Sequence, residues 1–512
     1  MHRRRFMRTV AQVGALTGVA GSSSLLSALP LPDDGLGWIA TPDNKNGRVL
    51  VVVRLFGGND GLNTLVPVHD DEYYRLRRDI SLNDLSIAAD QTLELNGVSH
   101  VRMHPAMKGL ATLYNEGKVA VVQGVGYPNM DLSHFRGTNI WLSASDSNVF
   151  ATDGWMGRYL ERRMEANDLE MKHPFAIECG PQLGRAFAGK RVPMGFAFTE
   201  HSNVPDALGP TDETSVAHDI ENIITSFEEQ GSNHLRSLSR TLATTKANPA
   251  SYYVNGGNLA PDLMTVSRCI RGGLATPMYI VHTGQFDTHY FQPLVHNQQL
   301  DELCTNLLAF QRELEHAGVD DRVTIMVISE FGRRPNTNNS GTDHGTAGPV
   351  FLIGRNVNDG MHGVQPTTTD LDVDGNMHWH VDFRSIYASI LEQWFESEPS
   401  FYIPSALARP FPTLPLFRMR PRPADRGSYS LAQPLLWPNP CSSILRISVA
   451  DTFTGTLRVT ITTVQGVPIR VADVPCALGS GEIDVSSLSQ GSYLVHMTSG
   501  AGSAVTSIVV AR

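Results

Sequence analysis

Acidic, histidine, serine and arginine side chains gather in four clusters of this chain, each placed just after an apolar run. The candidate metal ligands among them are Asp60, Asp287, His289, Glu330, Asp343 and His344. The most informative cluster begins at Ser329, where Glu330 and Arg333 end an apolar run and the Asp343-His344 pair follows in an expected loop. Carboxylates and neutral imidazoles are the ligands that divalent transition metals need. The pattern therefore predicts a metal-centred site.

Each cluster also has an ordinary structural interpretation when it is taken alone. Asp60 stands in the run Gly57-Gly-Asn-Asp-Gly61, which by itself is more typical of a plain turn. Asp287 and His289 are two residues apart and can reach one ion, but a turn with a surface histidine fits them equally well. Their joint placement after successive strands is what favours the metal site.

The run Ser133-His134-Phe135-Arg136 is expected to begin a helix. A helix N-terminus favours anions because its first N–H groups are free and its dipole is positive there. Ser133 could then be a nucleophile that faces a phosphate, with His134 or Arg136 binding the phosphate oxygens. A plain N-cap needs only the serine and is the simpler interpretation of this cluster alone. The catalytic candidates are Ser133, His134, Arg136 and Arg333.

Apolar, β-branched runs predict the strands that must position these side chains. They cover residues 49–56, 119–125, 277–282 and 322–329. Between the last two, apolar residues at steps of three and four predict an amphipathic helix, namely Leu300, Leu303, Leu307, Phe310 and Leu314. A second helix is expected from Arg384 to Phe395, with Asp382 and Arg384 paired at its start. Open α/β sheets bind ligands at the carboxyl ends of their strands, so the clusters should meet at one edge.

Composition divides the 512 residues into a leader, a large domain, a linker and a tail. Residues 1–45 carry a twin-arginine pattern at Arg4-Arg5 and predict an export signal with a linker, although a basic tail is the alternative. The large α/β domain is expected at 46–417, and an Arg- and Pro-rich linker at 418–432. Alternating short apolar and polar residues predict a small β-sandwich at 433–512.

Charge and composition exclude some classes of partner. The formal net charge of −10 argues against nucleic acid, and 41% hydrophobic residues indicate a chain with a large core. The apolar stretch near the N-terminus is too short and polar to span a bilayer, so no transmembrane segment is expected in the mature chain. Five cysteines are few for an exported chain, and Cys441 and Cys476 in the tail could pair.

Long, ordered motifs over about residues 47–417 resemble the exported bacterial family called domain of unknown function 1501. They are Leu55-Phe-Gly-Gly-Asn-Asp-Gly-Leu-Asn63, His104-Pro-Ala-Met107, Gly126-Tyr-Pro-Asn129, Ser133-His-Phe-Arg136, Phe286-Asp-Thr-His289, Ser329-Glu-Phe-Gly-Arg-Arg334, Gly341-Thr-Asp-His-Gly-Thr-Ala347 and Asp382-Phe-Arg-Ser-Ile-Tyr387. That family is grouped with the alkaline phosphatase and sulfatase superfamily. The resemblance implies a three-layer α/β sandwich with a mostly parallel central sheet, a two-metal site and a serine, threonine or modified cysteine nucleophile.

The same resemblance implies roles for single residues. Asp60 would be a metal ligand after the first strand, Ser133 the nucleophile, and His344 the last metal-binding histidine, assisted by Asp343. Asp287 and His289 would share one metal, but their spacing is two where phosphatases have four. Glu330-Phe331 stands where the superfamily has an Asp-His pair, so one imidazole is missing. No sulfatase maturation pattern is present, which argues against a formylglycine enzyme.

The tail resembles the C-terminal sorting domain of the type IX secretion system. The resemblance is carried by Trp437-Pro-Asn-Pro440 and by Ile483-Asp-Val-Ser-Ser-Leu-Ser-Gln-Gly-Ser-Tyr493. It implies an immunoglobulin-like β-sandwich, passage across the outer membrane with the secretion machinery as partner, and attachment to or release from the cell surface. A generic carbohydrate-binding or fibronectin-like module is the alternative.

Together these features predict a secreted or surface-attached, metal-dependent hydrolase of phosphate or sulfate esters. The cofactor would be one or two divalent ions, with zinc, manganese and calcium as candidates, and the substrate a small-molecule or polysaccharide ester. One alternative is a non-catalytic surface protein that keeps the fold and a structural metal. Another is a glycan-binding role, prompted by Trp141, Trp155 and Trp379.

Overall fold

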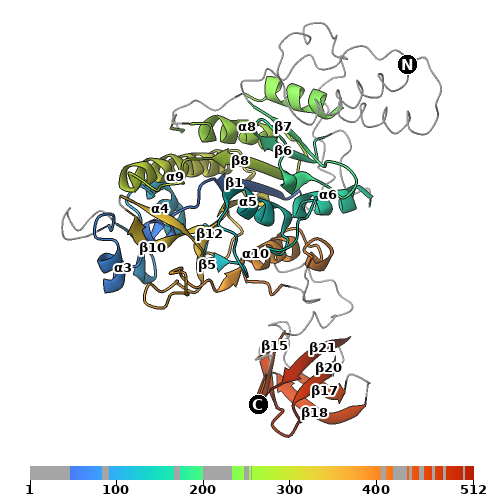
Figure 1. Cartoon of the computed structure of the whole chain (residues 1–512). Helices are drawn as coiled ribbons and strands as arrows, with labels where there is room; N and C mark the ends of the chain where they lie inside the picture. The colour runs from blue at the N-terminus through green and yellow to red at the C-terminus, as the bar shows by residue number, and fades with distance from the viewer. Residues whose placement is uncertain are drawn as a thin grey trace, which may run out of the picture. The chain divides into compact units, whose positions relative to one another are not determined.

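The computed structural model divides the chain into two compact units, Met1–Met419 and Arg420–Arg512 (Figure 1). The structure describes residues 47–82, 92–165, 173–199, 233–246, 253–254, 257–338, 340–404, 411–418, 435–437, 441–448, 455–463, 467–476, 480–499 and 502–511. The predicted export signal and nearly all of the predicted linker lie outside these residues. No helix in the ranges just given is long and apolar enough to cross a membrane.

A mixed β-sheet forms the centre of the first unit. Its strands are β1 (Val49–Leu55), β5 (Val119–Gly126), β6 (Ala176–Cys179), β7 (Phe196–Phe198), β8 (Met278–Thr283), β9 (Val323–Ser329), β12 (Gly348–Ile353), β13 (Gly360–Gly363) and β14 (Val381–Asp382). The order is β13-β5-β12-β9-β1-β8-β6-β7, and β14 pairs with β5. The four predicted strands are confirmed as β1, β5, β8 and β9. The sheet is mixed because β12 runs antiparallel to both β5 and β9, whereas the other pairs are parallel.

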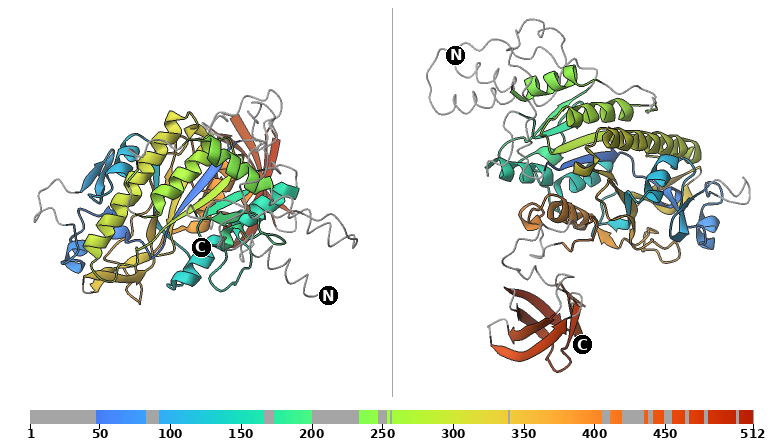
Figure 2. Two further views of the ribbon diagram at one scale, coloured as in Figure 1. Left: turned by 90° about the horizontal axis from the view of Figure 1, so that it is seen from above. Right: turned by 180° about the vertical axis from the view of Figure 1, so that it is seen from behind.

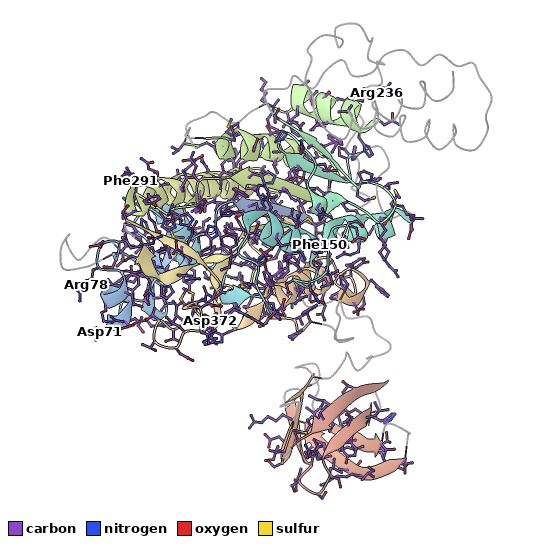
Figure 3. All side chains as sticks on the ribbon, in the orientation of Figure 1. Asp71, Arg78, Phe150, Arg236, Phe291 and Asp372 are labelled. Atoms are coloured by element: carbon purple, nitrogen blue, oxygen red, sulfur yellow. The ribbon has the colours of Figure 1, made fainter. Side chains whose placement is uncertain are left out.

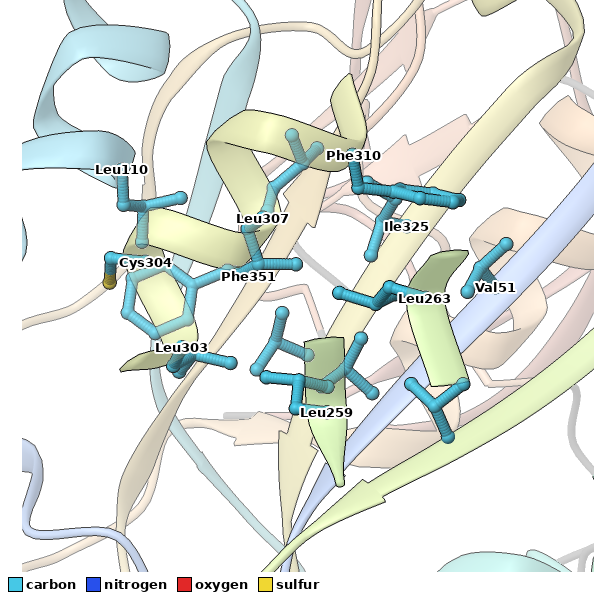
Figure 4. Close-up of a cluster of buried hydrophobic side chains, with 14 of the residues drawn as sticks. Val51, Leu110, Leu259, Leu263, Leu303, Cys304, Leu307, Phe310, Ile325 and Phe351 are labelled. Carbon is cyan, nitrogen blue, oxygen red and sulfur yellow. The ribbon is translucent and has the colours of Figure 1, made fainter. Parts of the chain in front are cut away.

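Helices cover both faces of this sheet. Successive side chains of a strand point to opposite faces, so a strand such as β1 contributes to two cores. Val51 and Val53 of β1 belong to a core shared with α4 (Lys108–Asn115), α8 (Leu259–Arg271) and α9 (Gln292–His316). Figure 4 shows part of this core, where Val51 and Ile325 of the sheet approach Leu263 and Phe310 of the helices. Leu50 and Val52 face the opposite core, formed with α5 (His134–Ser143), α6 (Trp155–Glu165) and α10 (Phe383–Ser389). Figures 1 and 2 show α8 and α9 on one side of β1 and β8.

The two predicted helices are confirmed. The helix with the apolar stripe is α9, and the helix expected after Asp382 is α10, which continues as the π-helical turn η4 (Ile390–Trp394). Asp382 caps α10 and accepts from the Arg384 side chain at 2.9 and 2.7 Å, as expected for that pair.

The segment expected as a loop before Asp343 and His344 is instead a β-hairpin. It consists of β10 (Gly332–Asn338) and β11 (Gly341–Gly345), and its antiparallel register pairs Arg333 with His344. Smaller elements follow β1 in the chain, namely α2 (Gly61–Thr64), β2 (Leu65–Val66), α3 (Asp71–Leu76), β3 (Leu93–Leu95) and β4 (Val98–Met103). The hairpin register matters for the site because it fixes an arginine and a histidine side by side.

The C-terminal unit contains two antiparallel sheets around one core. One sheet has the order β15-β16-β19 and the other β18-β17-β20-β21. Their bounds are β15 (Leu435–Trp437), β16 (Ile444–Ser448), β17 (Gly455–Thr463), β18 (Pro468–Cys476), β19 (Ser480–Asp484), β20 (Gly491–Ser499) and β21 (Gly502–Val510). Leu445, Val459 and Val495 belong to the shared core. Cys441 and Cys476 are both buried free thiols, so the disulfide considered from the sequence is not formed. The immunoglobulin-like assignment stays a prediction.

Candidate metal centre

Three polar side chains, His134, Asp287 and His344, converge at the carboxyl edge of the central sheet, and His289 lies beside them. Asp287 and His289 follow β8, His134 is the first residue of α5, and His344 lies on β11. The Oδ1 atom of Asp287 is 3.0 Å from His289 Nε2 and 3.1 Å from His344 Nε2, and its Oδ2 atom is 3.3 Å from His134 Nε2. The Nε2 atoms of His289 and His344 are 3.1 Å apart. The ligand atoms of His134, Asp287 and His344 all lie within 4.8 Å of one another.

The other ring nitrogen of each histidine contacts an acceptor. His344 Nδ1 lies 2.8 Å from the carbonyl oxygen of Leu132, and His134 Nδ1 lies 2.8 Å from Glu330 Oε1. A carbonyl or carboxylate oxygen accepts, so both Nδ1 atoms carry the proton and both Nε2 atoms present a lone pair in the neutral ring. His289 Nδ1 lies 3.4 Å from Asp343 Oδ1.

This arrangement leaves electron pairs facing one another. His134 Nε2 is buried and has no hydrogen-bond partner, since the contact with Asp287 lacks hydrogen-bond geometry. Lone pairs that converge at about 3 Å repel unless a positive charge lies between them. Imidazoles whose outer nitrogen is fixed by a carboxylate or carbonyl are the usual ligands of a metal ion. The donor set therefore fits a divalent transition metal.

Two predicted ligands, Glu330 and Asp343, contact the Nδ1 atoms of histidines and do not lie at the centre. Glu330 is 3% exposed, and its Oε1 atom also accepts the Gly57 N–H at 2.8 Å. It orients His134 and does not face the point where the Nε2 atoms meet. Asp343 contacts His289 and accepts from Asn338 at 2.8 Å. The prediction that both coordinate the metal directly is not supported by this geometry, because the histidines lie in between.

Arg333 holds the centre together and is not open to a substrate. Its guanidinium is completely buried and donates to the carbonyls of Gly58 at 2.8 Å and Thr342 at 2.7 Å. The same group donates to Asp287 Oδ1 at 2.7 Å. These contacts join the turn after β1, the segment after β8 and the hairpin. Arg333 was predicted as a catalytic residue, but in this structure it is a positioning residue.

Asp60 belongs to a different, fully buried network. Its carboxylate lies 2.5 Å from Arg77 Nη1, accepts from the Gln292 amide and caps α2 through the Leu62 N–H at 3.2 Å. Both Asp60 and Arg77 are 0% exposed. The prediction that Asp60 is a metal ligand is not supported by these contacts, since its negative charge is already neutralised by an arginine.

Ser133 and Arg136 have different surroundings in the structure. Ser133 is the exposed N-cap of α5, but its hydroxyl makes no capping hydrogen bond. Arg136 donates to the carbonyls of Ser147 at 2.7 Å and Val149 at 2.8 Å, and its guanidinium lies 4.1 Å from the centre of the Phe150 ring, labelled in Figure 3. These contacts engage one nitrogen of the Arg136 guanidinium, and the role of Arg136 in binding substrate oxygens stays a prediction.

Two glycines allow the segments around the metal centre to approach closely. Gly57 has φ +126°, and a Cβ atom there would lie 2.2 Å from the backbone nitrogen of Asp287. A Cβ atom on Gly341 would lie 2.3 Å from the carbonyl of His289.

Phe331, at the position where the resemblance implies a missing imidazole, packs its ring 5.0 Å from the ring of His134 and 4.6 Å from the ring of His344. The centre thus has an apolar ring after β9 in place of a second imidazole.

The electrostatic environment sets the charge of each group. Burial would raise the pKa of Asp287, but the hydrogen bond and the charge of Arg333 lower it to about 2. The hydrogen bond with Glu330 raises the pKa of His134, whereas burial lowers the pKa of His344. Asp287 is consequently anionic at neutral pH, and a metal must compete with a proton for His134.

His134 was the residue whose role the sequence did not show. It was assigned to substrate oxygens, whereas its Nε2 atom points at Asp287. The one local signal was a histidine directly after a helix-capping serine, and that signal does not specify what the ring faces. Glu330, which orients it, is 196 residues away in the sequence.

Comparison with known families gives two matches along the chain. Residues 232–394 match the family model described as protein of unknown function (DUF1501), and residues 435–511 match the secretion system C-terminal sorting domain. The chain therefore contains a segment similar to DUF1501, followed by one similar to the sorting domain. Both resemblances stated from the motifs are confirmed, and the DUF1501 match includes Asp287, His289 and His344. The sorting domain indicates secretion to the cell surface or the extracellular space.

Solved structures add looser likenesses. One is a protein in the alkaline phosphatase superfamily from Vibrio parahaemolyticus, with 10% identity, a TM-score of 0.32, and coverage of 92% of this chain and 88% of that chain. Another is the PsFucS1 sulfatase from Pseudoalteromonas sp., with 11% identity, a TM-score of 0.30, and coverage of 86% and 85%. The comparison with curated proteins gave no match.

Proposed function

We propose that this chain, exported by the twin-arginine route and then sorted by its tail, is a metal-dependent hydrolase of phosphate or sulfate esters. The observation that carries the proposal is the convergence of three imidazole Nε2 atoms on the Asp287 carboxylate, with the His134 Nε2 atom buried and unpartnered. The two imidazoles and one carboxylate within reach of one ion favour zinc over manganese and calcium, which prefer oxygen ligands. One ion accounts for His134, Asp287 and His344, and His289 contacts two of these side chains.

The chain's own residues would have separate roles around that ion. A bound divalent metal supplies Lewis-acid stabilisation of negative charge on the ester. The exposed Ser133 hydroxyl, free of the capping bond, would attack the phosphorus or sulfur atom. The new bond joins Ser133 Oγ to that atom as the bond to the alcohol oxygen breaks, and the alcohol leaves with a proton. Water then releases the phosphate or sulfate and regenerates the serine. The N-terminus of α5 favours the anion throughout.

The decisive experiment replaces Ser133 in the full mature chain. With p-nitrophenyl phosphate and p-nitrophenyl sulfate as substrates, Ser133→Ala should abolish turnover, while the metal content and melting temperature stay at the wild-type values. Ser99→Ala, an exposed serine on β4, is the matched control and should keep full turnover. Unchanged turnover in Ser133→Ala would refute the assignment of the nucleophile.

A non-catalytic surface protein with a structural metal is the second candidate. It is favoured by the loss of two expected ligands, because Asp60 pairs with Arg77 and Glu330 stands behind His134. This candidate prevails if the metal-loaded wild type turns over neither ester while removal of the metal lowers the melting temperature. A glycan site built on Trp141 and Trp155 is not supported, because both rings are buried in the core at 3% and 0% exposure.

A further inference from the structure

A second polar cluster lies at the same edge of the sheet as the metal centre. It consists of Arg54 at the end of β1, Glu178 on β6 and His282 on β8. The parallel register makes Arg54 and His282 direct neighbours and pairs Glu178 with Ile280. These positions share the face of Leu50, Val52 and Ile280, which is the face that α5 covers.

Arg54 lacks an acceptor although it is largely enclosed. Its Nε atom is buried and has no hydrogen-bond partner. The carboxylates that act on its charge are Glu178 and Glu330, and both are bound elsewhere. Glu178 contacts His282 Nε2 at 2.8 Å and accepts the Gly184 N–H, while Glu330 contacts His134. An enclosed cation without a hydrogen-bonded partner is unfavourable, so such a group is expected to have a ligand.

The Phe56 ring lies near both Arg54 and His134 of the metal centre. The guanidinium carbon of Arg54 is 5.8 Å from the centre of the Phe56 ring, and that ring is 5.2 Å from the ring of His134. Three other arginines near the centre have hydrogen-bond acceptors on the chain itself. Arg77 binds Asp60, Arg136 binds two carbonyls, and Arg333 binds Asp287 together with several carbonyls.

We propose that Arg54 binds a tetrahedral oxyanion, a phosphate or sulfate group, beside the metal centre. A guanidinium presents several N–H donors in one plane and matches two oxygens of such a group at once. Describing the bound anion as the substrate's ester group or the released product rests on the proposed function. The binding of the anion itself does not, because it needs neither turnover nor Ser133.

The test is a calorimetric titration of the full mature chain with inorganic phosphate and, separately, with sulfate. The wild type should bind at least one anion, and the ratio of the two affinities identifies the better source. Arg54→Gln should weaken binding about tenfold or more, since a charge-assisted hydrogen bond is lost. Arg54→Lys should retain part of the affinity because it keeps the charge and loses the planar donors. Arg75→Gln, an exposed arginine held by Glu72, should bind as the wild type does.

Two results would overturn the proposal. One is a wild-type chain that binds neither anion, and the other is an Arg54→Gln chain that binds as tightly as the wild type. If Arg54→Gln does not fold, Arg54→Lys decides the matter: lower stability with unchanged anion affinity would show that Arg54 only neutralises Glu178 and Glu330. Anion binding and ester turnover are measured separately, so this proposal and the hydrolase can fail independently. If the wild type binds the anion through Arg54 but turns over neither ester, the anion site stands and the hydrolase is refuted. If it turns over an ester but binds the anion equally well without Arg54, the hydrolase stands and the anion site is refuted.

Discussion

Asp60 and Asp287 both follow parallel strands at one edge of the sheet, yet the fold gives them different roles. The side chain of Asp60 is 0% exposed and pairs with Arg77, which is also 0% exposed. The side chain of Asp287 is 43% exposed and faces three imidazoles. Arg333 contacts Asp287 as well, but only at Oδ1, and its other donors go to carbonyls. A carboxylate's surroundings, more than its place after a strand, decide whether it holds a metal or a structural ion pair.

The largest expected effect is loss of the metal when a ligand at the centre is removed. In His344→Ala and in Asp287→Ala, the metal content of the purified chain should fall from near-stoichiometric to background, because each change removes one of the three donors that lie within reach of one ion. Elemental mass spectrometry of protein purified without added metal measures this directly. Asp60→Asn is the matched control at the same edge of the sheet and should keep its metal. Metal loss in Asp60→Asn, with metal retained in His344→Ala, would reverse the roles assigned to the two regions.

Breaking the buried pair should affect stability and leave the metal in place. Asp60→Ala leaves Arg77 charged and buried without its partner, which typically costs about 3–5 kcal/mol. The free energy of unfolding from urea titration measures the change. Asp343→Ala removes an acidic group that is about half exposed and should cost far less. Equal losses of unfolding free energy in the two variants would show that the Asp60–Arg77 pair stabilises the fold no more than the half-exposed Asp343 does.

The sequence predicted the elements that carry a local pattern. Strands β1, β5, β8 and β9 are continuous apolar runs, and α9 has apolar residues at helical spacing, so each could be found from neighbouring residues alone. The hairpin of β10 and β11 could not, because its strands are rich in Gly, Arg, Asn and Thr and its pairing rests on backbone hydrogen bonds.

The composition of the candidate centre was predictable, but its internal order was not. Asp287, His289 and His344 were singled out by residue type and spacing, and they do come together. The partner of Asp60 is a residue 17 positions away, and the partner of His134 is 196 positions away. Such pairings depend on tertiary contacts that leave no periodic trace in the sequence.

The buried network around Asp60 should make the fold sensitive to acid. Next to Asp60, His296 contacts Asn59 Oδ1 through Nε2 at 3.0 Å, while its Nδ1 atom is buried without a partner. Burial lowers the pKa of His296 to about 4, although the charge of Asp60 opposes this and Arg77 and Arg333 reinforce it. The nearby His104 is lowered in the same way, to about 3.

The sign of the effect follows from these shifts. Between about pH 6.5, the ordinary value, and pH 4, the unfolded chain binds a proton at His296 that the native chain does not, so stability falls as the pH falls. His296→Gln should reduce this loss between pH 7.5 and pH 4.5, as measured by urea unfolding with chelator present throughout so that metal release does not contribute. His316→Gln, at the exposed end of the same helix, should leave the loss unchanged. An unaltered acid slope in His296→Gln would show that other groups cause it.

The smallest effect is expected where a residue acts on the metal through another side chain. Glu330→Gln keeps the size of the side chain but removes the charge that fixes the proton on His134 Nδ1. Changes at such outer positions typically weaken metal affinity about 10- to 100-fold. Competition with a chelator of known affinity measures the loss, and Asp343→Asn should give a smaller one, because its contact with His289 is longer at 3.4 Å. If Glu330→Gln removed the metal as completely as His344→Ala, Glu330 would have to bind the ion directly, and the order of ligands read from the structure would be wrong.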